Sequence, residues 1–257
     1  MAFDLKDEKS VKEYLDKLGI EYRFGCFSER NPEACHLLGD YLEAVKKDYE
    51  KAAKIYKNNC EELNHPKSCH KIGNYTLLGK GREPENPKLA LKYFNKGCDL
   101  NDPDACLHSG LMLVTNGGFD QVDYNLKKAM EHLDKACEGN NSNACHYLSG
   151  MYISGVRKGG VKSRFNANSV LQEDNVPKTN EYDLQKDMTK AFSYAFKACN
   201  LKNMYACANL SQMYARGEGT EKNPELAEKY KAIAIELQDE YRTKKQTLTF
   251  QEGLKPK

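Results

Sequence analysis

The ten cysteines are the residues of this chain whose spacing points most directly to chemistry. Paired thiols can close disulfides, bind a metal ion or exchange disulfides with a substrate. Zinc sites commonly separate paired ligands by two to four residues, whereas seven or eight residues intervene here, and the chain has no Cys-x-x-Cys motif. The spacing therefore favours structural disulfides, each closed within its own pair: Cys26 with Cys35, Cys60 with Cys69, Cys98 with Cys106, Cys137 with Cys145, and Cys199 with Cys207.

Histidine directly follows the second cysteine of three pairs, at His36, His70 and His146. An imidazole together with a methionine thioether can bind haem iron, and the chain offers Met112, Met151 and Met213 at helical positions. An alternative function in haem or redox handling therefore stays open. Our main expectation is different, because methionines at such positions usually fill the core. We expect no bound metal or other cofactor, and histidines that lie on the surface of the repeats.

Motifs for catalysis are incomplete in this chain. Ser68-Cys69-His70-Lys71 fits the Ser-x-x-Lys pattern of penicillin-recognising enzymes, but the accompanying Ser-Asp-Asn and Lys-Thr-Gly motifs are missing. Gly79-Lys80-Gly81 lacks the spacing of a phosphate-binding loop. A disulfide reductase would need a pair that is strained or exposed. We therefore expect no catalytic residues, and β-lactamase activity in particular is not expected.

The cysteine pairs recur at a spacing that is typical of stacked helix pairs. The second cysteines follow one another at intervals of 34, 37, 39 and 62 residues. In the first three pairs, a proline between the paired cysteines marks the start of a helix. Four residues after each second cysteine comes a small residue, where another helix can approach closely: Gly39, Gly73, Gly110, Ser149 or Ser211. Ten residues after it, a residue that can end a helix in the left-handed conformation recurs in all repeats but the first, at Gly79, Asn116, Gly155 and Gly217.

These signals predict an all-α, right-handed solenoid of five disulfide-stapled helix-pair repeats. An N-terminal helix over 10–18 closes one end, and the repeats form a single array that runs to residue 245. The paired helices are expected at 32–46 with 48–62, 66–79 with 86–100, 103–115 with 124–138, 142–154 with 187–201, and 204–216 with 223–245. Residues 246–257 are expected to form a flexible tail, with an anchor at Leu248 and Phe250.

The interval of 62 residues contains an insertion at 155–186 that shows no sustained periodicity. Its polar, Gly- and Asn-containing composition is typical of a surface loop. A sharper interpretation treats Arg157, Lys158, Lys162 and Arg164 as a docking patch for an acidic partner. Because the insertion offers no periodic apolar face, we expect deletion of about 158–182 to leave the fold intact.

The composition makes nucleic acid and membranes improbable partners, and the cysteines raise the question of which cellular compartment holds the protein. The net charge is only +2, so the chain has no strong field that would attract nucleic acid or an anionic membrane. No run of residues has the length and apolarity of a membrane span. We expect a monomer that binds other proteins. The start of the chain lacks the features of a secretory signal, yet disulfides are rare in reducing compartments, and these two observations conflict.

The repeats resemble Sel1-like repeats. Leu148–Gly155 and Leu210–Gly217 match the first helix of that repeat, and Lys190–Cys199 matches the second. The cysteine pair at each joint is similar to the cysteine-rich subgroup, and the chain as a whole resembles its mitochondrial branch, the Sel1-repeat cytochrome c oxidase assembly factors. The residues that carry this likeness are Cys26 and Cys35 with Asn31-Pro32, Tyr75–Gly81, Tyr205–Asn209 and Leu248-Thr249-Phe250.

The resemblance implies a scaffold for the assembly of respiratory complex IV and, to a lesser extent, complex I. It also implies residence in the mitochondrial intermembrane space, which would resolve the conflict over the compartment. Implied partners are subunits or assembly factors of the respiratory complexes and the oxidative import machinery. The resemblance supplies no active-site residue, and it does not extend to the insertion, which is longer than the family usually carries.

Overall fold

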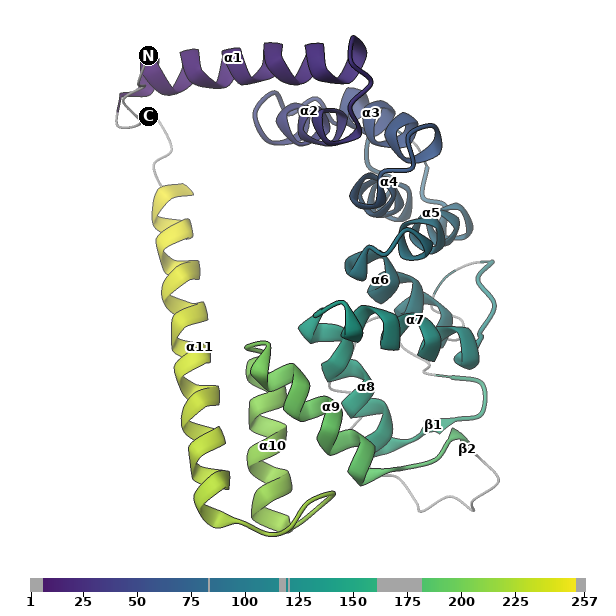
Figure 1. Ribbon diagram of the computed structural model, residues 1–257, viewed down its shortest axis with the longest axis vertical. Coiled ribbons are helices and arrows are strands. Elements are labelled where there is room, and N and C mark those ends of the chain that lie inside the picture. The colour runs from purple at the N-terminus through teal and green to yellow at the C-terminus, as the bar shows by residue number, and fades with distance from the viewer. Residues whose placement is uncertain (1–6, 83, 116–118, 120, 161–181, 253–257) are drawn as a thin grey trace. The chain divides into compact units, whose positions relative to one another are not determined.

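The computed structural model describes residues 7–82, 84–115, 119, 121–160 and 182–252, without the side chains of 244–252. Within these residues the chain forms eleven helices and two short strands (Figure 1). The helices are α1 (Glu8–Phe27), α2 (Pro32–Ala44), α3 (Tyr49–Glu61), α4 (Pro66–Leu78), α5 (Pro87–Asp99), α6 (Pro103–Val114), α7 (Leu126–Glu138), α8 (Ser142–Ser154), α9 (Met188–Asn200), α10 (Met204–Arg216) and α11 (Pro224–Glu252), and the strands are β1 (Val156–Arg157) and β2 (Tyr182–Leu184).

The helices belong to two compact units. One comprises residues 1–113 and 117–123, and the other comprises 114–116 and 124–257. In the first unit α2 packs against α3 and α4 against α5, and in the second unit α8 packs against α9 and α10 against α11. These are four of the five pairs that the spacing of the cysteines predicts, and the all-α, helix-pair repeat is confirmed. The fifth predicted pair, α6 with α7, is divided between the two units.

Side-chain caps fix where the first helices of the repeats begin. Asn31 Oδ1 accepts hydrogen bonds from the backbone of Glu33 and Ala34, and Asp102 Oδ2 accepts one from Ala105. His65 caps α4 in the same way, since its Nδ1 accepts the backbone N–H of Ser68 at 3.3 Å. Each cap satisfies backbone donors that a helix start leaves unpaired.

The expected helix ends are found where glycine takes a positive φ. Gly79 and Gly217 end α4 and α10 in the left-handed conformation. Gly155 follows α8 with a φ of 73° but a ψ of 168°, so the left-handed helical conformation expected there is wrong. The first repeat lacks glycine there and ends differently, as expected: Val45, the residue that caps α2 after Ala44, is in a right-handed conformation, and Lys47 takes a φ of 55°. Asn116 lies outside the described residues.

Small residues allow the helices of a pair to approach closely. A Cβ added to Gly73 of α4 would lie 2.6 Å from Cε1 of Phe94 in α5, which is itself fully buried. A Cβ on Gly39 of α2 would likewise collide with the ring of Tyr56 in α3. In these two repeats, large aromatic rings therefore occupy the space that glycine leaves, and the core forms around them.

Two predicted boundaries are wrong at the ends of the chain. The N-terminal helix was expected over 10–18, but α1 spans 20 residues from Glu8 to Phe27 and includes Cys26. The last helix was expected to end at residue 245, but α11 continues to Glu252. No glycine or proline interrupts 246–252, and the first such residue is Gly253. The prediction of a flexible tail is therefore wrong for 246–252. Residues 253–257 lie outside the described part of the chain. The side chains of Leu248 and Phe250, which were expected to form an anchor, also lie outside it.

The two ends of the insertion are also more ordered than a plain loop. β1 pairs with β2 in antiparallel orientation, with Val156 opposite Leu184, and Val156 is buried. Asp183 accepts hydrogen bonds from the Tyr124 hydroxyl at 2.9 Å and from the backbone of Gly159 at 3.2 Å. Residues 161–181 lie outside the described part. The described ends of the insertion are thus packed within the second unit.

Candidate functional site

Five disulfides join the end of one helix to the start of the next. They link the pairs that the sequence favours, and their Cα–Cα distances run from 4.4 to 4.8 Å, within the usual range for disulfides. All ten cysteines are buried, and even the most accessible, Cys26 and Cys199, are only 6% exposed. Attack by an external thiolate needs an accessible sulfur, so these bonds have the placement of structural staples and not of an exchange site.

A buried polar cluster lies beside the second staple and connects three helices. Asn59 of α3 donates through Nδ2 to the carbonyl of Pro32 at 2.8 Å and to Ser68 Oγ in α4 at 2.7 Å. Ser68 Oγ also lies 3.0 Å from His36 Nδ1 in α2 and 3.1 Å from His65 Nδ1. Paired buried polar groups fix one arrangement of their helices, because any other would leave them unpaired.

The orientation of the His65 ring follows from its contacts. Its Nδ1 accepts the backbone N–H of Ser68, and its Nε2 lies 3.0 Å from Glu33 Oε2. Burial lowers the pKa of neighbouring His36, and this favours the neutral imidazole that can share a hydrogen bond with Ser68. His36 is buried, so the expectation that it lies on the surface of the repeats is wrong.

The Ser-x-x-Lys match is not assembled as a catalytic site. Ser68 is fully buried, and Lys71 Nζ points to carboxylates, 3.2 Å from Asp40 and 3.0 Å from Glu43. Cys69 is bonded to Cys60. A buried hydroxyl held by an amide and two imidazoles cannot meet a substrate, so this cluster is a structural joint.

Lys71 belongs to an ionic cluster that ties α2 to α4 and to the turn after α4. Lys80 Nζ lies 2.6 Å from Glu43 and between the rings of Tyr49 and Tyr75, at 4.3 and 4.8 Å from their centroids. Burial disfavours the ionised form of Glu43, but the hydrogen bonds and charges of Lys80 and Lys71 outweigh it and lower its pKa to about 2. The Gly-Lys-Gly segment at 79–81 therefore serves to place a lysine on this carboxylate, and not to bind phosphate.

The other two histidines that follow cysteines also have protein surroundings. His70 packs against the rings of His108 and Phe94, and its Nε2 accepts from Asn74 Nδ2 at 3.0 Å. Burial, reinforced by the neighbouring His108, lowers the pKa of His70 to about 3. His146 lies beside Tyr147 and Tyr205, and burial lowers its pKa.

Two of the three methionines weighed as haem ligands are core residues. Met112 and Met213 are almost completely buried, and Met151 is partly exposed. Met112 packs with Ala90, Phe94, Phe119 and Val122, the gap-filling role that methionine usually has. Among the described residues, no group of three or more metal-binding side chains is gathered that could hold an ion.

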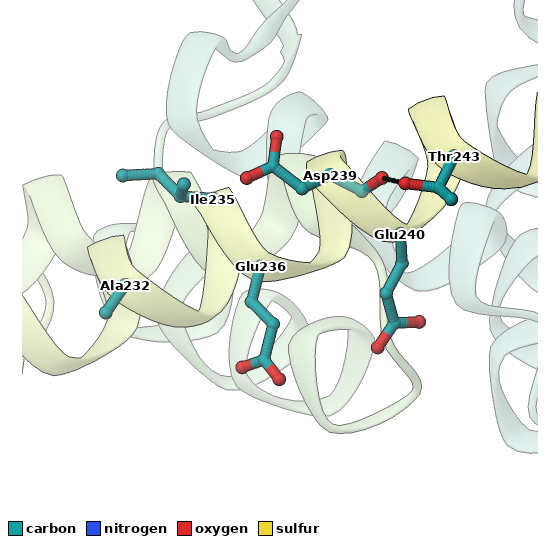
Figure 2. A pocket seen from close by; sticks show the side chains of 6 residues that line it. All are labelled: Ala232, Ile235, Glu236, Asp239, Glu240 and Thr243. Atoms are coloured by element: carbon teal, nitrogen blue, oxygen red, sulfur yellow. Dashed lines mark hydrogen bonds between the residues drawn. The ribbon is translucent and has the colours of Figure 1, made fainter. Parts of the chain in front are cut away.

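With the polar side chains of the joints used inside the protein, an accessible surface on α11 is the remaining candidate for a functional contact. Figure 2 shows a hollow lined by one face of α11 alone, with side chains three or four residues apart: Ala232, Ile235, Glu236, Asp239, Glu240 and Thr243. Thr243 Oγ1 donates to the Asp239 carbonyl at 2.8 Å. This exposed acidic and apolar face carries carboxylates without a neighbouring imidazole, thiol or lysine among its lining residues, so it suits a protein contact better than a reaction.

The proposed basic patch is only partly described. Arg157 in β1 and Lys158 after it are exposed, while Lys162 and Arg164 lie outside the described residues.

The part of the chain that the structure describes contains no helix with the length and apolarity needed to cross a membrane.

Sequence reasoning missed the polar cluster around Ser68 and the ionic cluster around Glu43. The contacts of His36 with Ser68 and of Glu43 with Lys80 join residues about one repeat length apart, so no local pattern brings them together. The signal that was present is the residue before each first cysteine: Asn59 stands where other repeats have Gly25, Gly97, Ala136 or Ala198, and a buried amide there requires polar partners.

Helix pairs of this length, stapled at each joint, define the class of protein. The family model for the Sel1 repeat matches residues 32–58, 66–102, 103–141, 181–203 and 205–239. A solved Sel1 repeat protein from Oxalobacter formigenes shares the fold, with a TM-score of 0.57 and 20% identity over 79% of this chain and 68% of its own. The chain is thus a disulfide-stapled Sel1 repeat protein.

Full-length relatives narrow the assignment. The chain is 56% identical to the cytochrome c oxidase assembly factor 7 homolog of Drosophila melanogaster, over 99% of this chain and 98% of that protein. It is 37% identical to cytochrome c oxidase assembly factor 7 of Xenopus tropicalis, over 97% and 98%, and 33% identical to the human protein of that name, over 87% and 72%. The chain belongs to the Sel1 repeat family and, within it, to the family of these assembly factor 7 proteins.

Proposed function

We propose that this protein is an interaction scaffold needed for the assembly of cytochrome c oxidase, complex IV of the mitochondrial respiratory chain. The observation that carries the proposal is the 56% identity over 99% of the chain to a relative named as a cytochrome c oxidase assembly factor. Identity of that extent includes the surfaces as well as the core, so the partners are expected to be shared.

The structure supports a scaffold on physical grounds. Polar side chains that resemble catalytic groups are used to join helices, as at Ser68 and Lys71. Stacked helix pairs bury a narrow core and leave a large surface for partners. The partners in this proposal are subunits or assembly factors of complex IV. A contribution to complex I assembly is the wider form of the same proposal.

The proposed compartment is the mitochondrial intermembrane space. Five buried disulfides fit a compartment where thiols are oxidised, and oxidative import there would close them. The oxidative import machinery is therefore the second proposed partner. In intact mitochondria the tagged chain should resist added protease and become sensitive once the outer membrane alone is ruptured. A reduced chain in the cytosol would contradict this placement.

The assembly role is tested by depletion and rescue. Cells that lack the protein should contain less assembled cytochrome c oxidase on native gels, at unchanged transcript levels of its subunits, and the wild-type chain should restore the complex. Normal amounts of assembled complex IV in fully depleted cells would overturn the proposal.

A further inference from the structure

Helix α1 exposes an apolar stripe of a kind that is unusual on a solvent-facing helix surface. Ile20, Phe24 and Phe27 are 65%, 59% and 65% exposed. Their spacing of four and three residues places them on one face of the helix over about two turns. The opposite face carries the contacts with α2, where Gly19 and Gly25 are buried.

The stripe on α1 can be compared with the equivalent positions in the four other repeats of the same chain. Counted from the first cysteine of each pair, the three residues stand at positions minus six, minus two and plus one. The helix ends share this register: Asn31 N–H donates to the Gly25 carbonyl as His65 N–H donates to that of Asn59. In the four other repeats these positions hold only polar or charged residues: Lys54, Asn58 and Glu61; Lys92, Lys96 and Asp99; Glu131, Lys135 and Glu138; Ser193, Lys197 and Asn200.

Packing does not account for the difference. The equivalent residues are exposed or partly exposed in every repeat, so folding does not require an apolar side chain at these positions. An exposed Phe or Ile at each of three matched positions is therefore a feature of the surface, and exposed apolar patches mark interaction sites.

The charges on α1 favour a protein over a membrane as the partner. The helix carries four basic and four acidic side chains: Lys9, Lys12, Lys17 and Arg23, and Glu8, Glu13, Asp16 and Glu21. Helices that lie on anionic membranes have a strongly basic polar face. A balanced face instead suits a partner of low net charge.

The area of the stripe favours a different protein over a second copy of this chain. Three half-exposed side chains of this size present on the order of 400 Å². A stable dimer needs about 800 Å² from each partner, so a self-contact through this stripe would fall well short. The linear arrangement over two turns matches the apolar seam of another helix.

We propose that Ile20, Phe24 and Phe27 form a docking surface for an amphipathic helix of a partner protein, one with apolar residues at spacings of three and four and little net charge. The proposal goes beyond the assembly role and does not depend on it.

The test replaces the stripe with the residues that α3 carries at the same positions: Ile20→Lys, Phe24→Asn and Phe27→Glu. These residue types are tolerated on the equivalent face, so the triple variant should keep the thermal midpoint of the wild-type chain. A matched control, Leu78→Lys, removes another exposed apolar side chain, 68% exposed at the end of α4, and should leave docking unchanged.

Docking is read in intact mitochondria by photocrosslinking from a benzoylphenylalanine at position 24 of the otherwise wild-type chain, with Lys92 as the reference site for the same probe. We expect a crosslink from position 24 to a peptide of another protein with the stated apolar spacing. Introducing Ile20→Lys and Phe27→Glu around the probe should lower its yield about tenfold or more. A yield no higher than that from position 92 would overturn the proposal. So would crosslinks only to a second copy, or flotation of the purified oxidised chain with phosphatidylcholine–cardiolipin vesicles that is lost in the triple variant.

Discussion

Glycine at the fourth position after a cysteine decides how closely two helices pack. Gly73 faces Phe94, and an added Cβ would lie 2.6 Å from that ring, whereas Gly150, also within a first helix, has nothing within 4 Å of an added Cβ. Gly73→Ala should therefore lower the free energy of unfolding by about 1–3 kcal/mol through overpacking. Gly150→Ala should raise it by up to about 1 kcal/mol through helix propensity. Urea unfolding with the disulfides intact measures both, and equal effects of the two changes would contradict the packing described.

The partly buried His70 makes stability depend on pH in a defined direction. Its pKa is about 3 in the folded chain against an ordinary 6.5, because of burial and the neighbouring His108. Below pH 6.5 the unfolded chain gains a proton that the folded chain does not, so stability is complete above that pH and falls as the pH falls. Between pH 7 and 5, this one residue should cost about 2 kcal/mol.

The comparison that isolates this effect is His70→Gln, because glutamine keeps an acceptor for Asn74 and does not titrate. Urea unfolding of both proteins at pH 7 and pH 5 should show a shallower loss of stability in the variant. The same loss in both proteins would mean that His70 is free to take up a proton in the folded state.

The strands at the two ends of the insertion are part of the second unit, so two deletions of different length should differ in their effect on stability. Deleting 162–180 and joining the ends with a short Gly-Ser linker should keep helicity and shift the thermal midpoint little, because long surface insertions cost little to close. The larger deletion of 158–182, which the sequence alone predicted would leave the fold intact, removes Tyr182 of β2 and Gly159, which donates to Asp183, so that expectation is revised. It should lower the midpoint measurably. Equal midpoints would show that the strand pair contributes nothing.

The sequence predicted most helices well and α1 poorly, for a physical reason. From α2 to α10, proline, asparagine, aspartate and glycine stand close to the helix ends, and the cysteines fix the register. On α1, apolar Ile20 and Phe24 are exposed while Gly19 and Gly25 are buried. The usual link between apolarity and burial is reversed there, so the periodic pattern ended too early.

Some contacts of the candidate site could be predicted from the sequence and others could not. Disulfide pairing followed from local spacing, whereas the contact of Ser68 with His36, and that of Lys80 with Glu43, join residues 32 and 37 positions apart. Only the packing of neighbouring repeats shows that these polar side chains meet. What resembled catalytic residues in the sequence is, in the fold, the polar part of the joints.

For the whole molecule, the position of a staple in the array should set its importance. Closing a loop of eight or nine residues contributes roughly 2–3 kcal/mol on the chain-entropy model. Loss of Cys98–Cys106 frees a joint with helices on both sides, but loss of Cys26–Cys35 frees only α1. Replacing Cys98 and Cys106 by alanine should therefore lower the thermal midpoint, and the steady-state level in mitochondria, more than replacing Cys26 and Cys35. The opposite order would contradict an array stabilised by its neighbours.

The claim on which the whole account depends is that the working protein is held by five closed staples. It is tested most directly by alkylating free thiols in intact mitochondria, before lysis, and mapping all ten cysteines by mass spectrometry without reduction. The account predicts no alkylated cysteine in the folded protein and five linked peptides, each joining the two cysteines of one pair. Alkylation of most of the ten cysteines, or links between different pairs, would contradict it.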